Sequence, residues 1–324
     1  MRANTENIRY TGRWYVTEQS AIATAPGSRF QLAFSGHSIV LHFDIEFISS
    51  PPPHLWISVD DGARIEVPID RHLRLQAGTV GNHIAEVILK SSITYGHRWH
   101  PPMNGRVEFV GWDGSPGCLP KEKKQTIEFV GDSITEGVFV DNELGEGLGW
   151  LGRPYQDDVT ATYAWLTACE LGLEPVISAY GGVGVTQPGG NVPKAAEMYP
   201  CCFSGTPIAY SNADYILMNY GANDREHSAE EFLREYRRLL DLVADHNPES
   251  KLILLAPFCG AFEQELELLR DRFTAERGRS LELIRTKGWI SPEPLHPGRE
   301  SHRILAERLT GALKALGIGS ADAG

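Results

Sequence analysis

Four short segments place chemically active residue types at or near the ends of apolar runs. Ser133 follows the apolar run at residues 126–130, and Asn223 follows a second such run. Gly184 lies in a glycine-rich segment after a third run, and His296 lies near the C-terminus. Acyl transfer needs a nucleophile, a base that takes its proton, and donors for the developing oxyanion. The four segments supply a hydroxyl, an imidazole, a backbone N–H and a carboxamide, so their combination indicates acyl-transfer chemistry.

Each of these residues also has an ordinary structural interpretation. Ser133 fits a helix cap, and Gly184 fits a turn. Asn223 fits an Asx-turn, and His296 fits a structural histidine beside a proline. For any one residue taken alone the structural interpretation is favoured, whereas the four together favour a catalytic site.

The elements after about residue 120 explain how these residues could meet. Short apolar segments alternate there with helical stretches, which predicts a parallel α/β sheet. The predicted strands cover residues 126–130, 175–180, 214–220 and 251–258. Helices are predicted after a capping box of Ser228 and Glu231 and over residues 299–316. Ligands bind beyond the carboxyl ends of such strands, so the residues just after each strand are expected to do the chemistry.

The first 120 residues have a different pattern. Short runs of alternating hydrophobicity are separated by turn residues, which predicts an all-β sandwich. The predicted strands cover residues 29–34, 38–45, 55–59, 64–69, 85–90 and 106–112. A charged, proline-containing segment at 119–125 is typical of a linker. The sequence therefore predicts two domains, a β-sandwich at 1–120 and an α/β domain at 121–324.

Four motifs of the α/β domain resemble the sequence blocks of the SGNH (GDSL-type) hydrolases, in the order found in that family. They are GDSIT at 131–135, GVGVT at 182–186, GAND at 221–224 and HPG at 296–298. The β-rich region in front of them is similar to carbohydrate esterase family 2, whose members carry a jelly-roll domain before an SGNH domain. The resemblance implies a flavodoxin-like, three-layer α/β fold preceded by a jelly-roll sandwich, with no metal or cofactor.

The resemblance also implies roles for single residues. In the family the serine attacks an acetyl ester on a sugar and the histidine is the general base. The block glycine, the asparagine and the N–H of the serine form the oxyanion hole. Carried over by motif, the nucleophile is Ser133, the base is His296, and the oxyanion donors are Ser133, Gly184 and Asn223. Gly184 is chosen over its neighbours because it stands two residues before Thr186.

Two positions depart from the pattern of the family. Glu293 stands where the family commonly has an aspartate three residues before the histidine. Its carboxylate could orient the imidazole as the acid of a triad, or a backbone carbonyl could take that role. Leu295 occupies the place of a tryptophan that often serves family 2 esterases as a sugar platform. Sugar stacking would then use another ring, with Tyr180, Tyr220 and Trp150 as candidates.

Composition excludes several classes of function. The chain of 324 residues has a formal net charge of −12 at pH 7, which disfavours binding to nucleic acid or to anionic membranes. No stretch approaches the length of a membrane span. The five cysteines include no C-x-x-C pair, so free thiols are expected. His97 and His100 lack further ligands at metal-binding spacing and are interpreted as part of a surface loop.

One motif matches the sequence pattern of dinucleotide-binding proteins. Gly147-x-Gly149-x-x-Gly152 matches the dinucleotide-binding fingerprint. It follows no predicted strand, and no βαβ unit with a downstream ribose-binding acid surrounds it. We therefore interpret it as a mobile loop near the site.

The sequence predicts a serine esterase that removes acetyl groups from small carbohydrate esters, such as acetylated xylo-oligosaccharides. Two alternatives stay open, a general short-chain carboxylesterase or thioesterase on the same scaffold, and a carbohydrate-binding protein whose hydrolase domain has lost turnover. The N-terminus lacks the apolar run of a secretory signal, so a cytoplasmic location is expected unless a leader was removed. The expected partner is the sugar ester, with no nucleic acid and no membrane, and formation of a homo-oligomer is left open.

Overall fold

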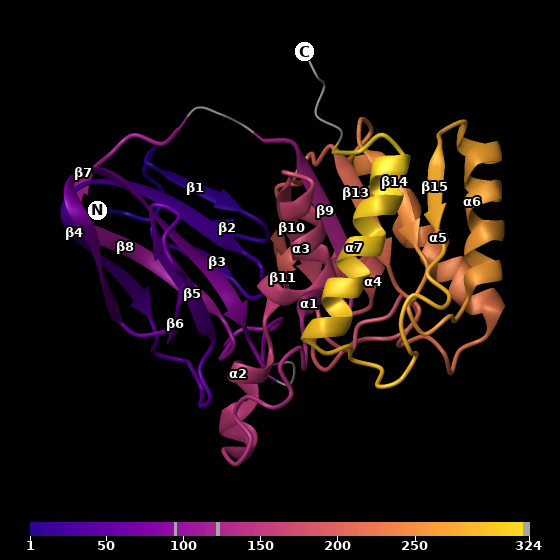
Figure 1. Cartoon of the computed structure of the whole chain (residues 1–324), viewed down its shortest axis with the longest axis horizontal. Coiled ribbons are helices and arrows are strands. Elements are labelled where there is room, and N and C mark those ends of the chain that lie inside the picture. Colours follow the sequence, from indigo (N-terminus) through magenta and orange to yellow (C-terminus); the bar gives the residue numbers. More distant parts are fainter. Residues whose placement is uncertain (94–95, 121–123, 320–324) are drawn as a thin grey trace.

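Two halves of the chain lie side by side in the computed structural model, which describes residues 1–93, 96–120 and 124–319 (Figure 1). The indigo and purple half consists of strands. The magenta-to-yellow half contains a sheet with helices around it. The short helix α2 (Arg153–Gln156) projects below the boundary between the two halves.

The N-terminal half is a single antiparallel sheet folded into a sandwich. Its strands are β1 Ile8–Thr11, β2 Tyr15–Val16, β3 Ala21–Ala23, β4 Arg29–Asp44, β5 His54–Val59, β6 Ile65–Pro68, β7 His72–Ser91 and β8 Val107–Pro116. They are ordered β2-β3-β8-β4-β7-β5-β6, and β1 also pairs with β4. Alternate residues of β4, among them Phe30, Leu32 and Phe34, are fully buried in one core. The predicted all-β sandwich is confirmed.

Two strands of the sandwich are longer than the sequence predicted. The segments predicted as strands at 29–34 and 38–45 form the single strand β4, which pairs with β7 on both sides of a register shift between Gly36 and Ser38. β7 begins at His72, because its exposed first half is held by backbone pairing with β4 and needs no hydrophobic alternation.

The C-terminal half alternates strands and helices. Its strands are β9 Thr126–Gly131, β10 Glu174–Ala179, β11 Cys201–Phe203, β12 Thr206–Pro207, β13 Tyr215–Asn219, β14 Lys251–Leu255 and β15 Leu281–Ile284. Its other α-helices are α1 Ser133–Glu136, α3 Tyr163–Glu170, α4 Ala195–Met198, α5 Ala229–His246, α6 Glu263–Arg277 and α7 Arg299–Ala315, and the 3-10 turns are η1 Gly149–Gly152 and η2 Val159–Ala161. In the described part of the chain no helix is long and apolar enough to cross a membrane.

The parallel sheet has the order β10-β9-β13-β14-β15, so its first strand lies between the second and the third. This is the flavodoxin-like arrangement that the resemblance implied. Side chains of β9 alternate between the two faces, because Ile127 and Phe129 join the core beneath α3 and α7 while Val130 joins the core beneath α4, α5 and α6. The three-layer α/β fold is therefore confirmed.

Two buried arginines of the N-terminal half reach into the C-terminal half. Arg13 donates to the hydroxyl of Ser178 at 3.2 Å. Arg98 forms an ion pair with Glu136, and both arginines are fully buried. The division into domains after residue 120 stays a prediction, and residues 121–123 of the predicted linker lie outside the described part of the chain.

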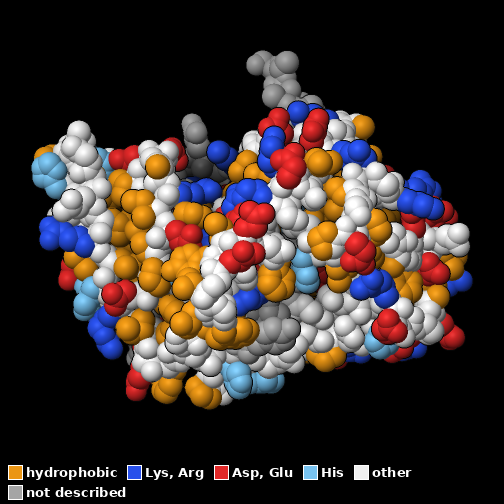
Figure 2. Space-filling view, turned by 60° about the horizontal axis from the view of Figure 1, so that its bottom comes forward, with side chains coloured by type: hydrophobic (Ala, Val, Ile, Leu, Met, Phe, Trp, Pro, Cys, Tyr) orange, Lys and Arg blue, Asp and Glu red, His pale blue; other side chains and the backbone are white. Residues whose placement is uncertain are grey.

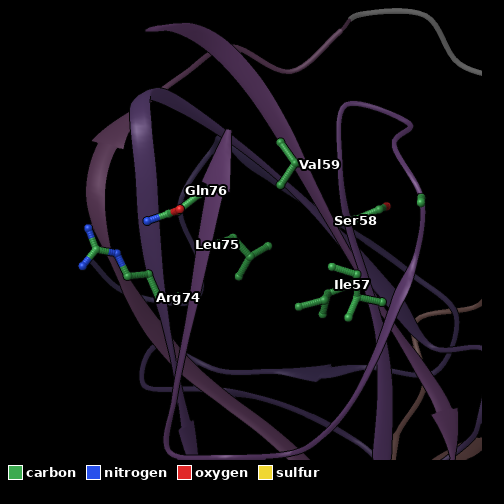
Figure 3. A pocket seen from close by; sticks show the side chains of 8 residues that line it. Ile57, Ser58, Val59, Arg74, Leu75 and Gln76 are labelled. Carbon is green, nitrogen blue, oxygen red and sulfur yellow. The ribbon is translucent and has the colours of Figure 1, made fainter. Parts of the chain in front are cut away.

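Two surface hollows lie away from the predicted catalytic residues. The first, of about 430 Å³, is on the sandwich, and Figure 3 shows Ile57 of β5 and Leu75 of β7 among the side chains that line it. The second, of about 700 Å³, lies between α3 and α7. Neither Ser133 nor His296 lines either of these hollows.

Candidate active site

Three of the four predicted segments leave the same edge of the parallel sheet. Gly131, the last residue of β9, pairs with the last residues of β10 and β13. The segments that carry Ser133, Gly184 and Asn223 therefore begin at one level. Strand order reverses at β9, and ligands of open α/β sheets bind at such a point.

Ser133 is the first residue of the one-turn helix α1. Asp132 caps this helix, because its Oδ1 accepts the N–H of Ile134 at 3.0 Å. Gly137 ends the helix in a left-handed conformation with φ of 92°. A Cβ at Gly137 would lie 2.5 Å from the carbonyl oxygen of Asp158, so only glycine fits there. Asp132 and Gly137 thus confine Ser133 to a tight turn at the end of the strand.

Ser133 and His296 are hydrogen-bonded to each other. Ser133 Oγ lies 2.9 Å from His296 Nε2, although the two residues are 163 positions apart in the chain. The segment between β15 and α7 brings the imidazole to this edge of the sheet. The structure therefore brings together the residues predicted as nucleophile and base, in the geometry that proton transfer needs.

The surroundings of His296 favour its neutral form. Burial lowers the pKa of the imidazole below its ordinary value, and the positive charge of Arg153 lowers it further. A neutral imidazole can accept the hydroxyl proton, so the histidine is available as a base at pH 7.

The carboxamide of Asn223 lies beside the turn that carries Ser133. Its Nδ2 donates to the carbonyl oxygen of Val183 at 3.0 Å and lies 3.4 Å from Asp132 Oδ2. Burial, together with the nearby charge of Asp224, raises the pKa of Asp132 to about 7. The amide therefore lies beside the residue that precedes the nucleophile, and its role as an oxyanion donor stays a prediction.

Gly184 lies in the same cluster, but its N–H already has an acceptor. A Cβ at this position would overlap the carboxylate of Asp224, so no larger residue fits. Asp224 Oδ1 in turn accepts the N–H and the hydroxyl of Thr186, at 2.8 and 2.6 Å. The N–H of Gly184 donates to the carbonyl of Gln187 at 3.0 Å, whereas the N–H of Ser133 has no acceptor among the described residues. Gly184 would have to share its proton to act as an oxyanion donor, and that role stays a prediction.

The structure does not bring Glu293 to His296. Glu293 is exposed, its carbonyl accepts from the hydroxyl of Ser291 at 2.7 Å, and its N–H donates back to the same hydroxyl at 3.3 Å. Within the described residues no hydrogen bond or ion pair joins its carboxylate to the imidazole. Of the two alternatives for orienting the imidazole, the contact with the carboxylate is not formed, because the turn around Ser291 holds the glutamate at the surface. Its contribution to activity stays a prediction.

Phe139, Arg153 and Asp157 lie outside the four family motifs; Phe139 contacts the base, and the other two contact Phe139. The ring centroid of Phe139 lies 5.5 Å from that of His296. The guanidinium carbon of Arg153 lies 3.8 Å from the Phe139 centroid. Asp157 Oδ1 accepts both the N–H of Phe139 at 2.8 Å and Arg153 Nη1 at 3.0 Å. The one sequence signal for this cluster was the spacing of four between Arg153 and Asp157, which is common on helices.

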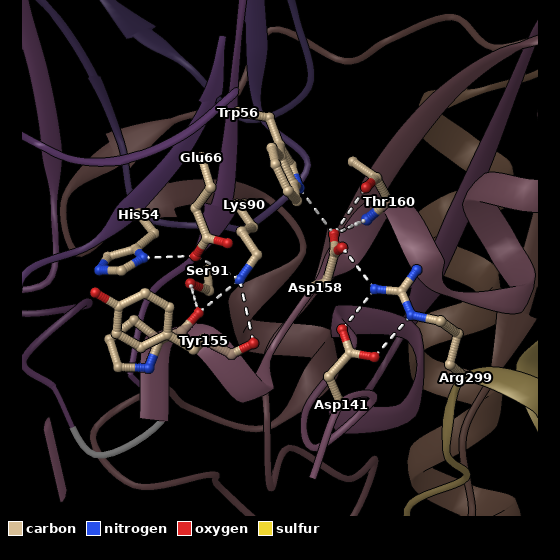
Figure 4. A network of polar contacts seen from close by, with 11 residues as sticks. His54, Trp56, Glu66, Lys90, Ser91, Asp141, Tyr155, Asp158, Thr160 and Arg299 are labelled. Carbon is tan, nitrogen blue, oxygen red and sulfur yellow. Dashed lines mark hydrogen bonds and ion pairs between the residues drawn. The ribbon is translucent and has the colours of Figure 1, made fainter. Parts of the chain in front are cut away.

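Both halves of the chain hold the segment that connects α1 to α3. Lys90 of β7 donates to the carbonyl of Pro154 at 2.8 Å. Arg299, at the start of α7, pairs with Asp158 at 3.3 Å. Figure 4 shows these contacts meeting the segment from two sides, with Lys90 on the sandwich side and Arg299 on the helical side. The segment that contacts His296 is therefore fixed to its surroundings at both ends of α2.

The same segment carries an exposed apolar surface, which we call the apolar lobe. The lobe consists of Leu144, Leu148, Trp150 and Leu151, which are 51%, 54%, 46% and 53% exposed. Figure 2 turns this end of the molecule toward the viewer and shows hydrophobic side chains gathered left of the centre. Four exposed apolar side chains fall within eight residues, unlike the single apolar residues scattered over most protein surfaces. Surfaces of this kind often contact ligands or partners.

Two of the three rings proposed as sugar platforms do not reach the surface. Tyr180 and Tyr220 are fully buried, and the hydroxyl of Tyr180 lies 2.9 Å from that of Thr24. The expectation that either ring stacks on a sugar is wrong, because both pack inside the core that covers β9. Trp150 of the apolar lobe stays a candidate.

The Gly-x-Gly-x-x-Gly motif does not have the surroundings of a dinucleotide site. Gly149–Gly152 forms the 3-10 turn η1 and leads into α2, and no strand precedes it between α1 and η1. In the described residues no group of three histidines, cysteines, aspartates or glutamates could hold a metal ion.

A match to the GDSL-like Lipase/Acylhydrolase family covers residues 129–304, which is more than half of the chain and includes Ser133 and His296. The chain belongs to this family. The resemblance to SGNH (GDSL-type) hydrolases is thereby confirmed. The family match begins within β9 and ends within α7, so it covers the parallel sheet and leaves the sandwich outside it.

The solved structures similar to this chain include the sandwich as well as the hydrolase sheet. The cellulase/esterase CelE of Acetivibrio thermocellus is 26% identical over 232 residues, which are 65% of this chain and 28% of that protein. The chain thus spans little more than a quarter of the curated relative it matches. A family two carbohydrate esterase from Clostridium thermocellum, solved with cellohexaose, has a TM-score of 0.77 at 22% identity and covers 96% of this chain and 99% of its own. An acetyl xylan esterase from Butyrivibrio proteoclasticus has a TM-score of 0.75 at 16% identity, with 97% of both chains covered. Sandwich and hydrolase sheet together therefore form the fold of family two carbohydrate esterases.

Proposed function

We propose that this family member is a serine esterase that removes acetyl groups from carbohydrate esters through an acyl-enzyme intermediate. The observation that carries the proposal is the 2.9 Å hydrogen bond between Ser133 Oγ and His296 Nε2. The N–H of Ser133 and the carboxamide of Asn223 lie at the same turn and supply donors for an oxyanion.

The reaction follows from these positions. Ser133 Oγ attacks the ester carbonyl while its proton passes to His296 Nε2. The carbonyl oxygen becomes negative and accepts hydrogen bonds from the Ser133 N–H and the Asn223 amide. The imidazolium then gives its proton to the departing sugar oxygen, which leaves the acyl group on the serine. Water, deprotonated by the same imidazole, attacks the acyl carbonyl. The bond between the acyl carbon and Ser133 Oγ then breaks, the imidazolium returns its proton to Oγ, and the carboxylic acid is released.

The choice of a carbohydrate substrate is supported by the relatives. CelE is named a cellulase/esterase, and the similar Clostridium thermocellum esterase was solved with cellohexaose. This chain has the same combination of sandwich and hydrolase sheet as the esterase solved with cellohexaose. The cytoplasmic location stays a prediction.

Acetate release from acetylated xylo-oligosaccharides tests the proposal. The wild-type protein should release acetate, and Ser133→Ala should release none while keeping its thermal unfolding midpoint. The nearest other hydroxyl of the turn, Thr135, is buried and bonded to Tyr163 at 2.8 Å, so it cannot replace the nucleophile. Equal release by the folded variant would refute the assignment of Ser133.

The apolar lobe favours a second candidate, a general short-chain carboxylesterase. Four exposed apolar side chains on the segment beside the base could bind an apolar acyl or alcohol group. A series of aryl esters from acetyl to octanoyl separates the two readings. A steep fall beyond acetyl agrees with a deacetylase, whereas a maximum at butyryl or longer chains supports the second candidate.

A further inference from the structure

We propose that Phe139 and Arg153 form a positioning stack that holds the imidazole of His296 in place of a third catalytic carboxylate. The proposal rests on the proposed function in one respect, the role of His296 as the base of Ser133. It assigns a task to two residues that the motifs of the family do not include.

The base has no carboxylate partner, which leaves its orientation to other contacts. Glu293 lies at the surface, and among the described residues nothing accepts a hydrogen bond from His296 Nδ1. In a Ser-His-Asp arrangement that bond fixes the tautomer and the plane of the ring. Here the contact that meets the ring is the side chain of Phe139, at 5.5 Å between centroids and 61° between planes. An edge-to-face contact of this kind restricts how the imidazole can rotate.

Phe139 is itself held in an unusual conformation. Its φ of 60° lies in the left-handed region, which a phenylalanine seldom occupies without support from its surroundings. The support comes from Asp157, whose Oδ1 accepts the N–H of Phe139 at 2.8 Å. The next residue, Val140, accepts the N–H of Arg299 at 2.9 Å. The backbone of Phe139 is therefore fixed from two elements, and its ring is directed to the base.

Arg153 completes the stack and is locked to the same aspartate. Its guanidinium lies 3.8 Å from the Phe139 centroid, within the range of cation–π contacts. Nη1 and Nη2 each lie 3.0 Å from an oxygen of Asp157, which makes a two-pronged ion pair with both side chains almost fully buried. Lys90 holds the carbonyl of the next residue, Pro154, so the sandwich also restrains the arginine.

The positive charge gives the stack a measurable consequence. Arg153 lowers the pKa of His296, in the same direction as burial does. With Arg153 present, the imidazole therefore stays neutral down to a lower pH than it would if it were only buried. The same charge makes the imidazolium formed during the reaction less stable. Removal of the charge should raise the pKa of the imidazole and move the acid limb of activity to higher pH.

Other charged groups surround the base and must be separated from this effect. Asp157, whose pKa burial raises to about 6, pairs with Arg153, and Asp132, whose pKa burial raises to about 7, precedes the nucleophile. On α7, Arg299 is charged, and burial lowers the pKa of His302 to about 3, so that histidine stays neutral.

The rate at which a fluorophosphonate labels Ser133 tests the stack without assuming any substrate. We would measure this rate from pH 4 to 9 for the wild type, Arg153→Lys, Arg153→Met, Phe139→Leu and Arg153→Met/Asp157→Asn. The double variant removes both charges, so no buried carboxylate is left unpaired. Arg237→Met is the matched control. Arg237 also pairs with an aspartate four residues on, Asp241, at 2.8 Å, and its guanidinium carbon lies 5.5 Å from the ring centroid of Phe273. Arg237 lies on α5, and within the described part of the chain no contact joins it to the base.

The stack predicts a different result for each variant. Arg153→Met and the double variant should shift the acid limb to higher pH by about half a unit or more. Arg153→Lys keeps the charge and should leave the limb in place, with a plateau rate about threefold to tenfold lower because the planar contact is lost. Phe139→Leu should lower the plateau rate and kcat by a similar factor with KM unchanged. Arg237→Met should match the wild type.

The proposal is overturned if folded Arg153→Met and the double variant share the acid limb of the wild type and Phe139→Leu labels within twofold of its rate. A different result is labelling that depends on Ser133 and His296 while acetylated sugars release no acetate. That result would refute the proposed substrate, and the labelling rates alone would then support or refute the stack. Labelling of the wild type that does not depend on His296 would refute both proposals.

Discussion

Arg98 and Glu136 form an ion pair in the interior of the protein, although they belong to different halves of the chain. The side chain of Arg98 is 0% exposed and that of Glu136 is 2% exposed. Glu136 lies three residues after Ser133 and also accepts the N–H of Gly181. The N-terminal half therefore supplies the positive charge that pairs with Glu136, on the same helix as the nucleophile.

Loss of this arginine should destabilise the whole protein. Arg98→Met leaves a buried carboxylate without its partner, which costs about 3 to 5 kcal/mol in other proteins. Urea unfolding measures the change, and Arg303→Met is the control because Arg303 pairs with Glu300 at 2.7 Å on the surface. The control should lose about 1 kcal/mol or less. Equal losses in the two variants would show that burial of the pair does not matter.

Asn223→Ala should reduce turnover more than substrate binding. The carboxamide at the turn of Ser133 is expected to bind the oxyanion, an interaction that tightens in the transition state. Removal of one such donor costs about 10² to 10³ in kcat in other hydrolases. Steady-state kinetics measure kcat and KM separately, and Asn142→Ala on the connecting segment serves as control. A variant with raised KM and unchanged kcat would make Asn223 a substrate-binding residue instead.

Glu293→Gln should have a small effect, since the glutamate is exposed and bonded through its backbone to Ser291. We expect kcat to fall by less than about fivefold, which is on the order of 1 kcal/mol. His296→Ala, measured beside it, should abolish most activity because the base is lost. A hundredfold fall for the glutamine variant would mean that the turn rearranges in solution to form a triad.

Stability should fall as pH rises through the range in which Asp132 ionises. Burial raises the pKa of this carboxyl from 3.8 to about 7, so the folded state binds a proton that the unfolded chain releases near pH 4. Well below pH 3.8 the carboxyl is protonated in both states, and its stabilising contribution is lost as pH rises from 3.8 through about 7. Asp132→Asn keeps the helix cap and removes the titration. Urea unfolding from pH 4 to 8 should show a flatter profile for the variant, and identical profiles would contradict the raised pKa.

The parallel sheet and the four motif residues could be predicted from the sequence, because apolar runs and short motifs within a few residues of each other indicate both. The apolar strands β9 and β13 end at Gly131 and Asn219, which pair with each other, so the segments after them begin at the same edge of the sheet. The positions of the apolar runs in the sequence are enough to predict this. The long strand β7 was predicted only from residue 85, since its earlier residues are exposed and carry no alternation. β15 was missed because it is four residues long with two half-buried positions.

The support around the base could not be predicted in the same way. Arg98 is buried beside Glu136, 38 positions along the chain, and Arg153 is buried beside Phe139, whereas sequence alone gives arginine a surface location. Phe139 acquires its role from a left-handed backbone that Asp157 fixes, which no local pattern encodes. Glu293 had the spacing of a triad acid, but the turn around Ser291 directs it outward.

Trapping of the acyl-enzyme tests the central claim most directly. The protein is mixed with an acetylated xylo-oligosaccharide, quenched in acid within milliseconds, digested and examined by mass spectrometry. The account predicts one acetyl group on the peptide that contains Ser133, present in the wild type, strongly reduced in His296→Ala and absent in Ser133→Ala. Acetate release at the wild-type rate with no acetyl group on Ser133, or an acetyl group on another residue, would contradict it.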